Sequence, residues 1–583
     1  MATNDLFKQS QTAERMSFIG LDLGTSSLKA LLIDRDQRVL AEHNVPLAVA
    51  RPSQGWVEQD PQSWCDAALV ALTALGSKAD CSGVLGLGLA GHMHGATLVG
   101  VDDKPLRPCM LWNDTRSHKQ AGVMDADPQF REVTGNIVFP GFTAPKVAWV
   151  RENEPAVFDR IAKVLLPKDY LRLFLTGEHV SEMSDAAGTS WFDSKARGWS
   201  DQLLAKCGLR KDQMPRLVEG TATSGILRAD LARALDLPQM VIAGGAGDNA
   251  AAAIGAGVVR NGSAFLSLGT SGVMFAANDG YRPAPETAIH SFCHALPETW
   301  HQMGVVLAAS DALEWLARLT GQTAQHLTAD LGKVTAPSRT VFLPYLGGER
   351  TPHNDAAIRG QFLHLDHATD ARAAARAVLQ GVSYAFADCK DAFLATGTEI
   401  ESALAMGGGA KSNHWVSMLA STLNIRLDLP MAGDFGAALG AARLGMMAAT
   451  GAGAGVAYPP EIARTFAPDP DLRAAMADGH QRYRAAYTAL KALCNGLAFC
   501  VAKGVLAAPL VRHRLSRAFL TKTTVSFQRK GLNEKDRLNF QQRGCLRACC
   551  KEKTHQHVSG GRQYVGWGAT SRHAFLTRMS LGM

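Results

Sequence analysis

The stretch LDLGTSS at residues 21–27 recurs as LSLGTSG at residues 266–272. In each copy an apolar run ends in a turn of small residues and a second apolar run follows, which predicts a β-hairpin. The matching glycines, Gly24 and Gly269, lie 245 residues apart, about the length of one large domain. The repeat therefore predicts two domains of similar build, each with such a hairpin. Chance similarity of two glycine turns is the alternative.

Strand and helix patterns alternate around the first copy. Strands are expected at residues 17–23, 28–34, 39–48 and 84–90. Trp64, Ala68 and Leu72 share one face at helical spacing, which predicts a helix over 61–75. A strand-rich start followed by alternating helices and strands indicates an α/β fold.

The chain divides into four expected segments. They are a leader outside the fold at 1–15, a first domain at 16–258, a second domain at 259–493 and a basic tail at 494–583. The tail holds 16 Lys+Arg and 3 Asp+Glu, which leaves 44 and 50 for the other residues out of totals of 60 and 53. The net charge of +7 thus comes from the tail, so we expect no nucleic-acid partner for the two mildly acidic domains. The tail has no steady period, and we expect it to be disordered or non-native.

Cysteine spacing and apolar runs bear on the compartment. Six of the 11 cysteines are scattered before residue 494, which suits free thiols in a reducing cytoplasm. No apolar run reaches the ~18 residues that a membrane span needs, and residues 1–15 lack the apolar core of a signal peptide. We expect a cytoplasmic protein without membrane association, whose translation starts at Met1 or Met16. The sequence does not fix the oligomeric state, and a homodimer is left open.

The first copy of the repeat carries polar groups suited to phosphate. Backbone N–H groups of a small-residue turn can form a nest for phosphate oxygens. Thr25 and Ser26 add hydroxyl donors, and Lys29 follows closely. Asp22 can hold Mg²⁺ directly or through water, whereas the second copy has Ser267 at that place. The alternative is an ordinary hairpin with a capping aspartate.

A second polar cluster, GGAGDNA at 244–250, follows the apolar run MVIA at 240–243. Asp248 opens an expected helix, and a carboxylate at a strand-to-helix junction faces a cleft in α/β folds. Such a carboxylate can accept the proton of a hydroxyl that attacks phosphorus. The alternative is that Asp248 or Asn249 merely caps the helix.

A third cluster joins GHMHGAT at 91–97 to WNDTR at 112–116. Planar hydroxyl partners beside an apolar surface suit a sugar. The candidates here are Met93, His94, Trp112 and Asn113. His92 and His94 also suggest a metal, but two histidines without a third ligand nearby make a weak metal signal.

A fourth cluster is MGGGAKSN at 406–413. Three glycines let the backbone approach a nucleotide closely, and Lys411 and Asn413 can contact phosphate or the purine surround. The segment is not a Walker A loop, because Ala410 stands where glycine must precede lysine. An Ala-rich helix is expected after GDFG at 433–436, packed behind this site.

Two glycine patterns offer a dinucleotide site as a weaker alternative. GLGLAG at 86–91 lies inside an expected strand and opens no clear helix. GAGDNA at 245–250 carries Asp248, whose negative charge would repel a pyrophosphate at a helix N-terminus.

Five longer segments allow a comparison with known families. They are GFTAPKVAW (141–149), LLPKDYLRL (165–173), MSDAAGT (183–189), HSFCHAL (290–296) and LPYLGGERTPH (343–353). With the clusters above, and in this order, they resemble the FGGY family of carbohydrate kinases over about residues 18–490. Within the family the chain is most similar to members that act on D-xylulose. Beyond residue 493 the chain resembles nothing in the family.

The resemblance implies two actin-like, ribonuclease-H-like domains around a cleft, with the sugar mainly on the first and ATP mainly on the second. It implies that ATP and Mg²⁺ serve to phosphorylate D-xylulose, with Asp248 as proton acceptor and Asp22 as the metal-linked carboxylate important for activity. Met93 and His94 are implied to contact the sugar, and we expect Asn249, beside Asp248, to do so too.

For the nucleotide the resemblance implies a binding surface in the second domain. Its residues are Gly269, Thr270, Gly407, Gly408 and Gly409. We expect Asn413 to belong to the same surface, with Thr25, Ser26 and Lys29 meeting the phosphates from the first domain.

Three other functions stay open at this point. A sister kinase would act on ribulose, fuculose, glycerol or gluconate, although GHMHG with Trp112 and Asn113 favours xylulose. A sugar-sensing scaffold on the same fold would need neither Asp22 nor Asp248. The basic tail could bind nucleic acid by itself, and its irregular Cys/His spacing is a weak zinc signal.

Overall fold

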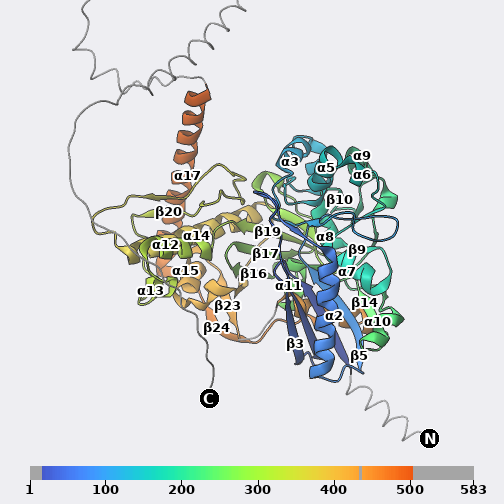
Figure 1. Cartoon of the computed structure of the whole chain (residues 1–583). Coiled ribbons are helices and arrows are strands. Elements are labelled where there is room, and N and C mark those ends of the chain that lie inside the picture. Colours follow the sequence, from blue (N-terminus) through green and yellow to red (C-terminus); the bar gives the residue numbers. More distant parts are fainter. Residues whose placement is uncertain (1–15, 432–435, 503–583) are drawn as a thin grey trace, which may run out of the picture. The chain divides into compact units, whose positions relative to one another are not determined.

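The computed structural model of the chain describes residues 16–431 and 436–502. The expected leader at 1–15, and residues 503–583 of the expected tail, lie outside this range. The described residues contain two seven-stranded sheets (Figure 1). We call residues 16–258 the first lobe and the described residues from 259 onward the second lobe.

The first sheet is built on the predicted hairpin. Its strands are β1 (Ser17–Leu23), β2 (Ser27–Asp34), β3 (Val39–Pro46), β5 (Val84–Gly91), β13 (Thr223–Ile226), β14 (Val241–Ala243) and β15 (Ala246–Gly247). Strands β1 and β2 pair antiparallel, with Asp22 opposite Lys29. Strands β1, β14 and β15 all run parallel to β5. The four predicted strands are confirmed, with the third ending at Pro46.

The second sheet repeats the same opening. Its strands are β16 (Ala264–Leu268), β17 (Gly272–Asn278), β18 (His290–Cys293), β19 (Trp300–Val306), β22 (Ser402–Met406), β23 (Arg426–Pro430) and β24 (Ile462–Phe466). Strand β16 pairs antiparallel with β17 and parallel with β22, as β1 does with β2 and β5. The predicted duplication of the hairpin is therefore a duplication of its sheet surroundings as well, and the predicted two-domain α/β fold is confirmed.

Helices and short strand pairs complete both lobes. The first lobe has α2 (Pro61–Lys78), α3 (His118–Asp125), α4 (Pro128–Thr134), α5 (Thr143–Asn153), α6 (Pro155–Phe158), α7 (Pro167–Thr176), α8 (Met183–Ala186), α9 (Asp201–Lys206), α10 (Ala229–Ala234) and α11 (Asp248–Gly255). The second lobe has α12 (Ser310–Thr320), α13 (Ala324–Thr328), α14 (Ala371–Ala395), α15 (Asn413–Leu423), α16 (Ala437–Thr450) and α17 (Arg473–Ala502). The short pairs are β4 (Glu58–Gln59) with β7 (Cys109–Met110), β6 (Thr97–Val99) with β8 (Lys163–Leu165), β9 (Val180–Glu182) with β12 (Arg216–Val218), β10 (Phe192–Asp193) with β11 (Gly198–Trp199), and β20 (Val341–Leu343) with β21 (Gln361–Leu363).

Helix α2 shows how local sequence sets an element. Asp60 caps its N-terminus by accepting a hydrogen bond from the backbone N–H of Gln62, and proline occupies the first helical position. Trp64, Ala68 and Leu72 are buried on one face, as their spacing predicted. The helix runs to Lys78, three residues past the expected end.

The Ala-rich helix α16 lies elsewhere than expected. It packs against β1, β5 and α11 of the first lobe, and the expectation that it packs behind the 406–413 segment is wrong. A Cβ atom at Gly88 on β5 would lie 1.8 Å from the carbonyl oxygen of Ala441, and one at Gly440 would lie 1.8 Å from that of Ala251. The helix thus rests directly on backbone, which only small residues on both sides allow.

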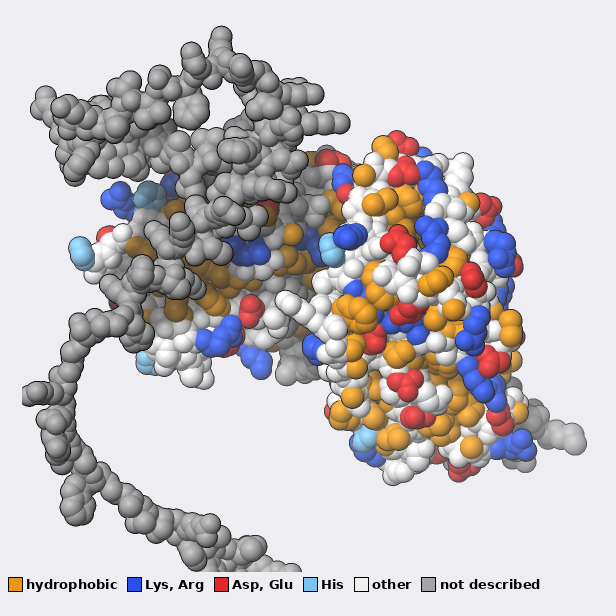
Figure 2. Space-filling view, turned by 45° about the horizontal axis from the view of Figure 1, so that its top comes forward, with side chains coloured by type: hydrophobic (Ala, Val, Ile, Leu, Met, Phe, Trp, Pro, Cys, Tyr) orange, Lys and Arg blue, Asp and Glu red, His pale blue; other side chains and the backbone are white. Residues whose placement is uncertain are grey.

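Helix α17 closes the described part of the second lobe. It begins at Arg473, buries Met476, Tyr483 and Tyr487, and continues past Leu493 to Ala502, into the segment expected as tail. Within the residues that the structure describes, no helix is both long and apolar enough to cross a membrane. On the face of the first lobe seen in Figure 2, Lys and Arg side chains lie among Asp and Glu side chains.

Candidate active site

Asp22 lies near the end of β1, opposite Lys29 on β2. Its side chain is half-buried, and burial, followed by the negative charge of Asp248, raises the pKa of Asp22 to about 7, while Lys29 acts in the opposite direction. A carboxyl group in this situation ionises more readily when a further cation lies beside it. Asp22 is therefore suited to bind a positive ion at the carboxyl end of its strand.

Asp22 and Asp248 come together because their strands flank β5. Ala90 on β5 pairs with Asp22 on one side and with Ala246 on the other. Strands β1 and β15 thus end at the same edge of the sheet, and the chain enters α11 at Asp248 directly after β15. The carboxyl ends of parallel strands form the edge at which ligands bind in α/β folds.

Asp248 is the first residue of α11, not its cap. The N-cap position is Gly247, and no side chain of the residues that the structure describes caps the helix, so the capping alternative is not supported. The backbone N–H and the side-chain amide of Asn249 both donate to Oδ1 of Asp248, at 2.7 and 2.9 Å. Among the described residues no hydrogen bond reaches Oδ2. Burial raises the pKa of Asp248, while the two bonds from Asn249 lower it.

Met93 and His94 follow β5 at this edge. Met93 packs against the turn before Asp248: a Cβ atom at Gly247 would lie 2.9 Å from Cγ of Met93. His94 has a φ of 69°, in the left-handed region. Its ring lies 4.5 Å from that of Phe142 between centroids, so the predicted apolar surface is present beside a polar ring.

The hydrogen bonds of His94 fix which ring nitrogen carries the proton. Nδ1 lies 2.9 Å from the carbonyl oxygen of Gly188, and a carbonyl can only accept, so Nδ1–H donates. Burial, followed by Lys146, lowers the pKa of His94 to about 3, so the ring is neutral. Nε2 of the neutral ring is therefore an acceptor, suited to a hydroxyl donor.

His92 faces another way and packs edge-on against Trp64 of α2, at 5.7 Å between ring centroids. Burial lowers the pKa of His92 to about 3. Over residues 16–431 and 436–502, no group of three or more His, Cys, Asp or Glu side chains is arranged to hold a metal ion. The alternative of a metal site on His92 and His94 therefore finds no support.

Trp112 connects two of the predicted clusters. Its side chain is 48% exposed, and Nε1–H donates to Oγ1 of Thr25 at 3.0 Å. The hairpin turn and the 112–116 segment thus lie together, 87 residues apart in sequence. Asn113 is half-buried, and its Oδ1 accepts no hydrogen bond from the described residues. Ser26 is exposed in the same turn.

Lys29 points along the neighbouring strand, where Nζ lies 3.3 Å from the Glu42 carboxylate on β3. It also lies close enough to Asp22 to lower the pKa of that carboxyl group. Lys29 therefore has two carboxylates around it on the first sheet.

The glycine-rich segment of the second lobe lines a pocket of about 780 Å³. Its walls come from α12, α13, the turn after β22 and the start of α15. The lining residues include Ser310, Leu313, Glu314, Gln325, Thr328, Gly408, Gly409, Lys411, Asn413 and Trp415. The volume lies within the range of small-molecule sites. Gly407 precedes this wall with a φ of 87°, which glycine adopts without strain.

Gly269 and Thr270 form the turn of the second hairpin and meet the same pocket through Ser310. The backbone N–H and the hydroxyl of Ser310 both donate to the carbonyl oxygen of Gly269, at 2.9 and 2.5 Å. The backbone N–H groups of Ala309 and Asp311 donate to the carbonyl of Thr270. The sequence-predicted residues of the second lobe are therefore contiguous.

Two residues next to the site, Lys146 and Arg172, could not be predicted from the sequence to lie there. Lys146 is buried and donates to the carbonyl oxygens of His94, at 2.8 Å, and Gly141. Arg172 donates to the carbonyls of Ala243 and Gly244, just before Asp248. Lys146 and Arg172 occur in segments quoted above for the family resemblance, but their burial could not be predicted, because isolated Lys and Arg are normally exposed.

Comparison with known proteins identifies one family and several relatives for most of the described region. The family model for the N-terminal domain of the FGGY family of carbohydrate kinases matches residues 17–255, and the model for its C-terminal domain matches residues 264–449. The xylulose kinase of Escherichia coli (strain K12) is 48% identical over 435 residues, which cover 74% of this chain and 90% of that protein. The xylulose kinase of Klebsiella pneumoniae is 47% identical over 440 residues, with coverages of 74% and 90%.

Solved structures show the same similarity. A crystal structure of a xyloylose kinase from Brucella ovis superposes with a TM-score of 0.81 at 55% identity, covering 82% of this chain and 100% of that one. A xylulose kinase from Rhodospirillum rubrum gives a TM-score of 0.76 at 26% identity, with coverages of 82% and 99%. Since both domain models match in order, each on one of the two sheets with a duplicated hairpin, the chain belongs to the FGGY family of carbohydrate kinases.

Proposed function

We propose that this chain phosphorylates D-xylulose with ATP, giving D-xylulose 5-phosphate and ADP. The substrate is supported by the two relatives that are xylulose kinases and share 48% and 47% of their residues with this chain over 90% of their length. One observation carries the chemistry: one carboxylate oxygen of Asp248 has no hydrogen-bond partner among the described residues, and it lies at the sheet edge where β1 ends beside Asp22.

Asp248 is the proposed general base. The acceptor hydroxyl gives its proton to Oδ2, its oxygen forms a bond to the γ-phosphorus, and the bond from that phosphorus to the ADP oxygen breaks. The electron pair of the broken bond stays on ADP. Because Asn249 donates only to Oδ1, it orients the carboxylate and leaves Oδ2 available to the substrate. Burial raises the pKa of Asp248, which brings its basicity closer to that of an efficient base at neutral pH.

Asp22 is the proposed ligand of Mg²⁺, directly or through water. Its half-buried carboxyl group, with a pKa raised to about 7 by burial and by Asp248, fits a site that a cation completes. One or two carboxylates are enough, because Mg²⁺ keeps several waters and binds substrate phosphates in such sites. When bound, the ion supplies neutralisation of the phosphate charge.

The proposed sugar contacts are Met93, His94, Trp112, Asn113 and Asn249. His94 offers Nε2 as an acceptor, because its Nδ1–H is committed to the Gly188 carbonyl. Trp112 has an exposed face beside Thr25, suited to the apolar side of a sugar. Asn113 has a buried carbonyl oxygen that accepts no hydrogen bond from the described residues, and a sugar hydroxyl could supply one.

The pocket of about 780 Å³ is the proposed ATP site. One wall of the pocket is formed by Gly408, Gly409 and Asn413, and Gly407 adjoins this wall. Ser310 connects the pocket to the turn of Gly269 and Thr270. Thr25, Ser26 and Lys29 are proposed to meet the phosphates from the first lobe.

The proposed location is the cytoplasm, which supplies ATP and keeps thiols reduced. The six cysteines before residue 494 are all free and buried. A nucleic-acid or membrane partner is not part of the proposal, and the homodimer stays an open alternative.

An ADP-release assay across D-xylulose, ribulose, fuculose, glycerol and gluconate tests the substrate. Gluconate is included because a gluconate kinase from Lactobacillus acidophilus superposes with a TM-score of 0.76 at 25% identity. We expect D-xylulose to give a kcat/KM at least ~100-fold above the others, the range that a differently bonded hydroxyl can provide. If another acceptor gives a higher kcat/KM than D-xylulose, the assignment of D-xylulose as the substrate is wrong.

Asp248→Ala tests the chemistry in the same assay. We expect kcat to fall by ~10²–10⁴-fold, the usual contribution of a general base. ATP binding, followed by calorimetry, should stay within about twofold. Near-normal turnover of this variant would refute the assignment of the base.

A further inference from the structure

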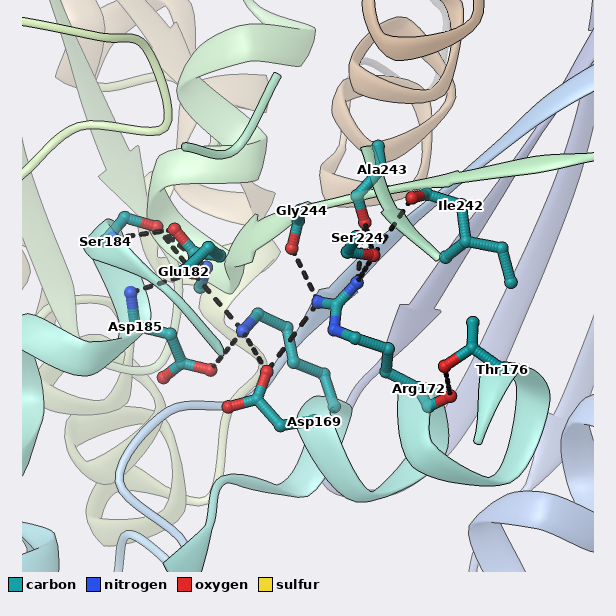
Figure 3. A network of polar contacts seen from close by, with 12 residues as sticks. Asp169, Arg172, Thr176, Glu182, Ser184, Asp185, Ser224, Ile242, Ala243 and Gly244 are labelled. Carbon is teal, nitrogen blue, oxygen red and sulfur yellow. Dashed lines mark hydrogen bonds and ion pairs between the residues drawn. The ribbon is translucent and has the colours of Figure 1, made fainter. Parts of the chain in front are cut away.

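Five ionisable side chains are fully buried next to the turn that leads to Asp248. They are Lys168, Asp169 and Arg172 on α7, Glu182 at the end of β9, and Asp185 on α8. Charged side chains are almost never fully buried unless they are paired. Figure 3 shows the three carboxyl groups and Arg172 gathered between α7 and the strands of the first sheet.

Lys168 is at the centre of this group. Its Nζ lies 2.9 Å from Oδ1 of Asp169, 3.3 Å from Oε1 of Glu182 and 3.0 Å from Oδ2 of Asp185. Arg172 lies 3.7 Å from Asp169 on the same helix. Burial raises the pKa of Asp185 well above its usual range, while the neighbouring Lys168 lowers it. Buried ion pairs are often no more stabilising than apolar side chains of similar volume, so stability alone does not account for this group.

Arg172 joins the group to the start of the turn. Its Nη1 donates to the carbonyl oxygen of Ala243 and its Nη2 to that of Gly244, both at 2.6 Å (Figure 3). Nη1 also donates to the hydroxyl of Ser224 at 2.6 Å, and this hydroxyl donates in turn to carbonyl oxygens at the end of β14. The guanidinium thus fixes two successive carbonyl groups where β14 ends.

Glu182 joins the group to the end of the turn. Its carboxylate accepts hydrogen bonds from the backbone N–H of Ser184 at 2.6 Å and from that of Asp185 at 2.9 Å. The hydroxyl of Ser184 donates to the same carboxylate at 3.0 Å and accepts from the backbone N–H of Gly247 at 3.1 Å. Gly247 is the residue directly before Asp248.

The turn has few side chains of its own that could fix the position of Asp248. Three of the four residues between Ala243 and Asp248 are glycines, which carry no side chain to pack. Gly245 has a φ of 76°, and a Cβ atom there would lie 2.1 Å from the carbonyl oxygen of Leu89. The backbone of the turn pairs with β5 at Ala246 and Gly247, and Arg172 and Ser184 add side-chain hydrogen bonds at its two ends.

We propose that the buried group around Lys168, acting through Arg172 and Ser184, is a positioning unit that sets the place of the Asp248 carboxylate. The proposal rests on the proposed role of Asp248 as general base. A displacement of about 1 Å in a catalytic group can cost ~10²-fold in rate, even when the mutation is far from the chemistry. Arg172 and Ser184 are positioning residues, because neither is exposed and each acts on backbone that leads to Asp248.

Ser184→Ala is the sharpest test, since it removes one hydroxyl and leaves every charge of the buried group in place. We expect kcat for D-xylulose to fall ~10–100-fold, with KM for ATP within about twofold of the wild-type value. Ser181→Ala is the matched control: Ser181 is equally buried on β9, and its hydroxyl has no hydrogen-bond partner among the described residues. This control should keep kcat within about twofold.

A double-mutant cycle with Asp248→Ala separates positioning from a general loss of structure. If Ser184 acts through Asp248, Ser184→Ala causes no further loss of kcat in the Asp248→Ala background. The same fold-loss in both backgrounds would mean that Ser184→Ala lowers the fraction of folded enzyme, and would overturn the proposal. A wild-type kcat for Ser184→Ala would overturn it too.

Arg172→Lys gives a second, independent measurement. Lysine keeps the charge but cannot donate to both carbonyls in a fixed fork, so kcat should fall ~10-fold or more and again show no added loss beside Asp248→Ala. Failure of this inference is distinguishable from failure of the proposed function. An inactive Asp248→Ala with a normal Ser184→Ala rejects the positioning unit alone, whereas an active Asp248→Ala rejects the base.

Discussion

Asp22 and Asp248 stand on opposite sides of β5, and the charge of one raises the pKa of the other. Ala90 of β5 pairs with Asp22 on β1 and with Ala246, two residues before Asp248. Burial contributes most to the raised pKa of Asp22, about 7, and Asp248 is the next cause. Two carboxyl groups so placed are poorly ionised together until a cation joins them.

This relationship predicts how pH and Mg²⁺ act together on activity. Both carboxyl groups must be ionised, and both have raised pKa values, so kcat/KM should fall as pH decreases from about 7 toward 5. Raising the Mg²⁺ concentration should shift this acidic limb to lower pH, because the cation favours the ionised form of Asp22. The measurement is a set of pH–rate profiles at two Mg²⁺ concentrations, with KCl at equal ionic strength as control. If the pH of the acidic limb does not change with the Mg²⁺ concentration, Asp22 is not the Mg²⁺ ligand.

Asp22→Asn should make the protein more stable while removing its activity. Asp22 has a pKa of 3.8 when unperturbed and about 7 in the folded protein, so between these pH values the unfolded chain binds fewer protons than the folded one. Wild-type stability therefore falls as pH rises through this window and stays low above it. Asparagine does not titrate, so the variant should gain on the order of 2–4 kcal/mol over wild type at pH 8.

Urea unfolding at pH 5 and pH 8 measures this gain. At pH 5 the difference in free energy of unfolding between variant and wild type should be clearly smaller, because Asp22 is protonated in the folded protein there. An equal difference at both pH values would mean that the side chain is not held in its neutral form by the fold.

Local patterns in the sequence were enough to predict the elements that carry the site. The two hairpins, the junction before Asp248 and the turn after β22 each follow an apolar run that ends in small residues. Such a pattern is typical of a strand followed by a tight turn, whatever surrounds it. The residue types at these places then suggested their chemistry, which stays a prediction for each side chain.

The contacts that join distant segments could not be predicted in this way. Helix α16 is rich in small apolar residues, which would fit equally well behind the glycine segment of its own lobe or on β5. In the structure it packs on β5. The bond from Trp112 to Thr25 spans 87 residues, and no local pattern indicates it. The burial of Lys168 contradicts the general preference of lysine for the surface, and only its three carboxylate neighbours explain it.

The close packing of α16 on β5 predicts a strong effect at Gly88. In Gly88→Ala the new methyl group would lie 1.8 Å from the carbonyl oxygen of Ala441, so the helix has to move away from the sheet. We expect a loss of about 3 kcal/mol or more in the free energy of unfolding, as for other overpacked cores. Gly76→Ala on the exposed side of α2 is the control, because within the described part of the chain no atom lies within 4 Å of its Cβ position. It should gain about 0.5–1 kcal/mol. Equal effects of the two changes in urea unfolding would exclude tight packing at Gly88.

Gly408 gives a test of the nucleotide pocket that does not depend on stability. It lies in the 3₁₀ turn Gly408–Lys411 and lines the pocket of about 780 Å³. No atom of the described residues lies within 4 Å of its Cβ position. In Gly408→Leu the new side chain should therefore fit the folded protein but occupy space that the proposed ATP needs.

Gly455, in the 3₁₀ turn Ala454–Val456, provides the control, because it has equally open surroundings and lies away from the pocket. We expect Gly408→Leu to raise KM for ATP at least ~10-fold, a cost of about 1.4 kcal/mol in binding, with KM for D-xylulose within about twofold. Gly455→Leu should change neither constant, and both variants should unfold at the wild-type temperature without ligand. An unchanged KM for ATP in a folded Gly408→Leu would move the nucleotide out of this pocket.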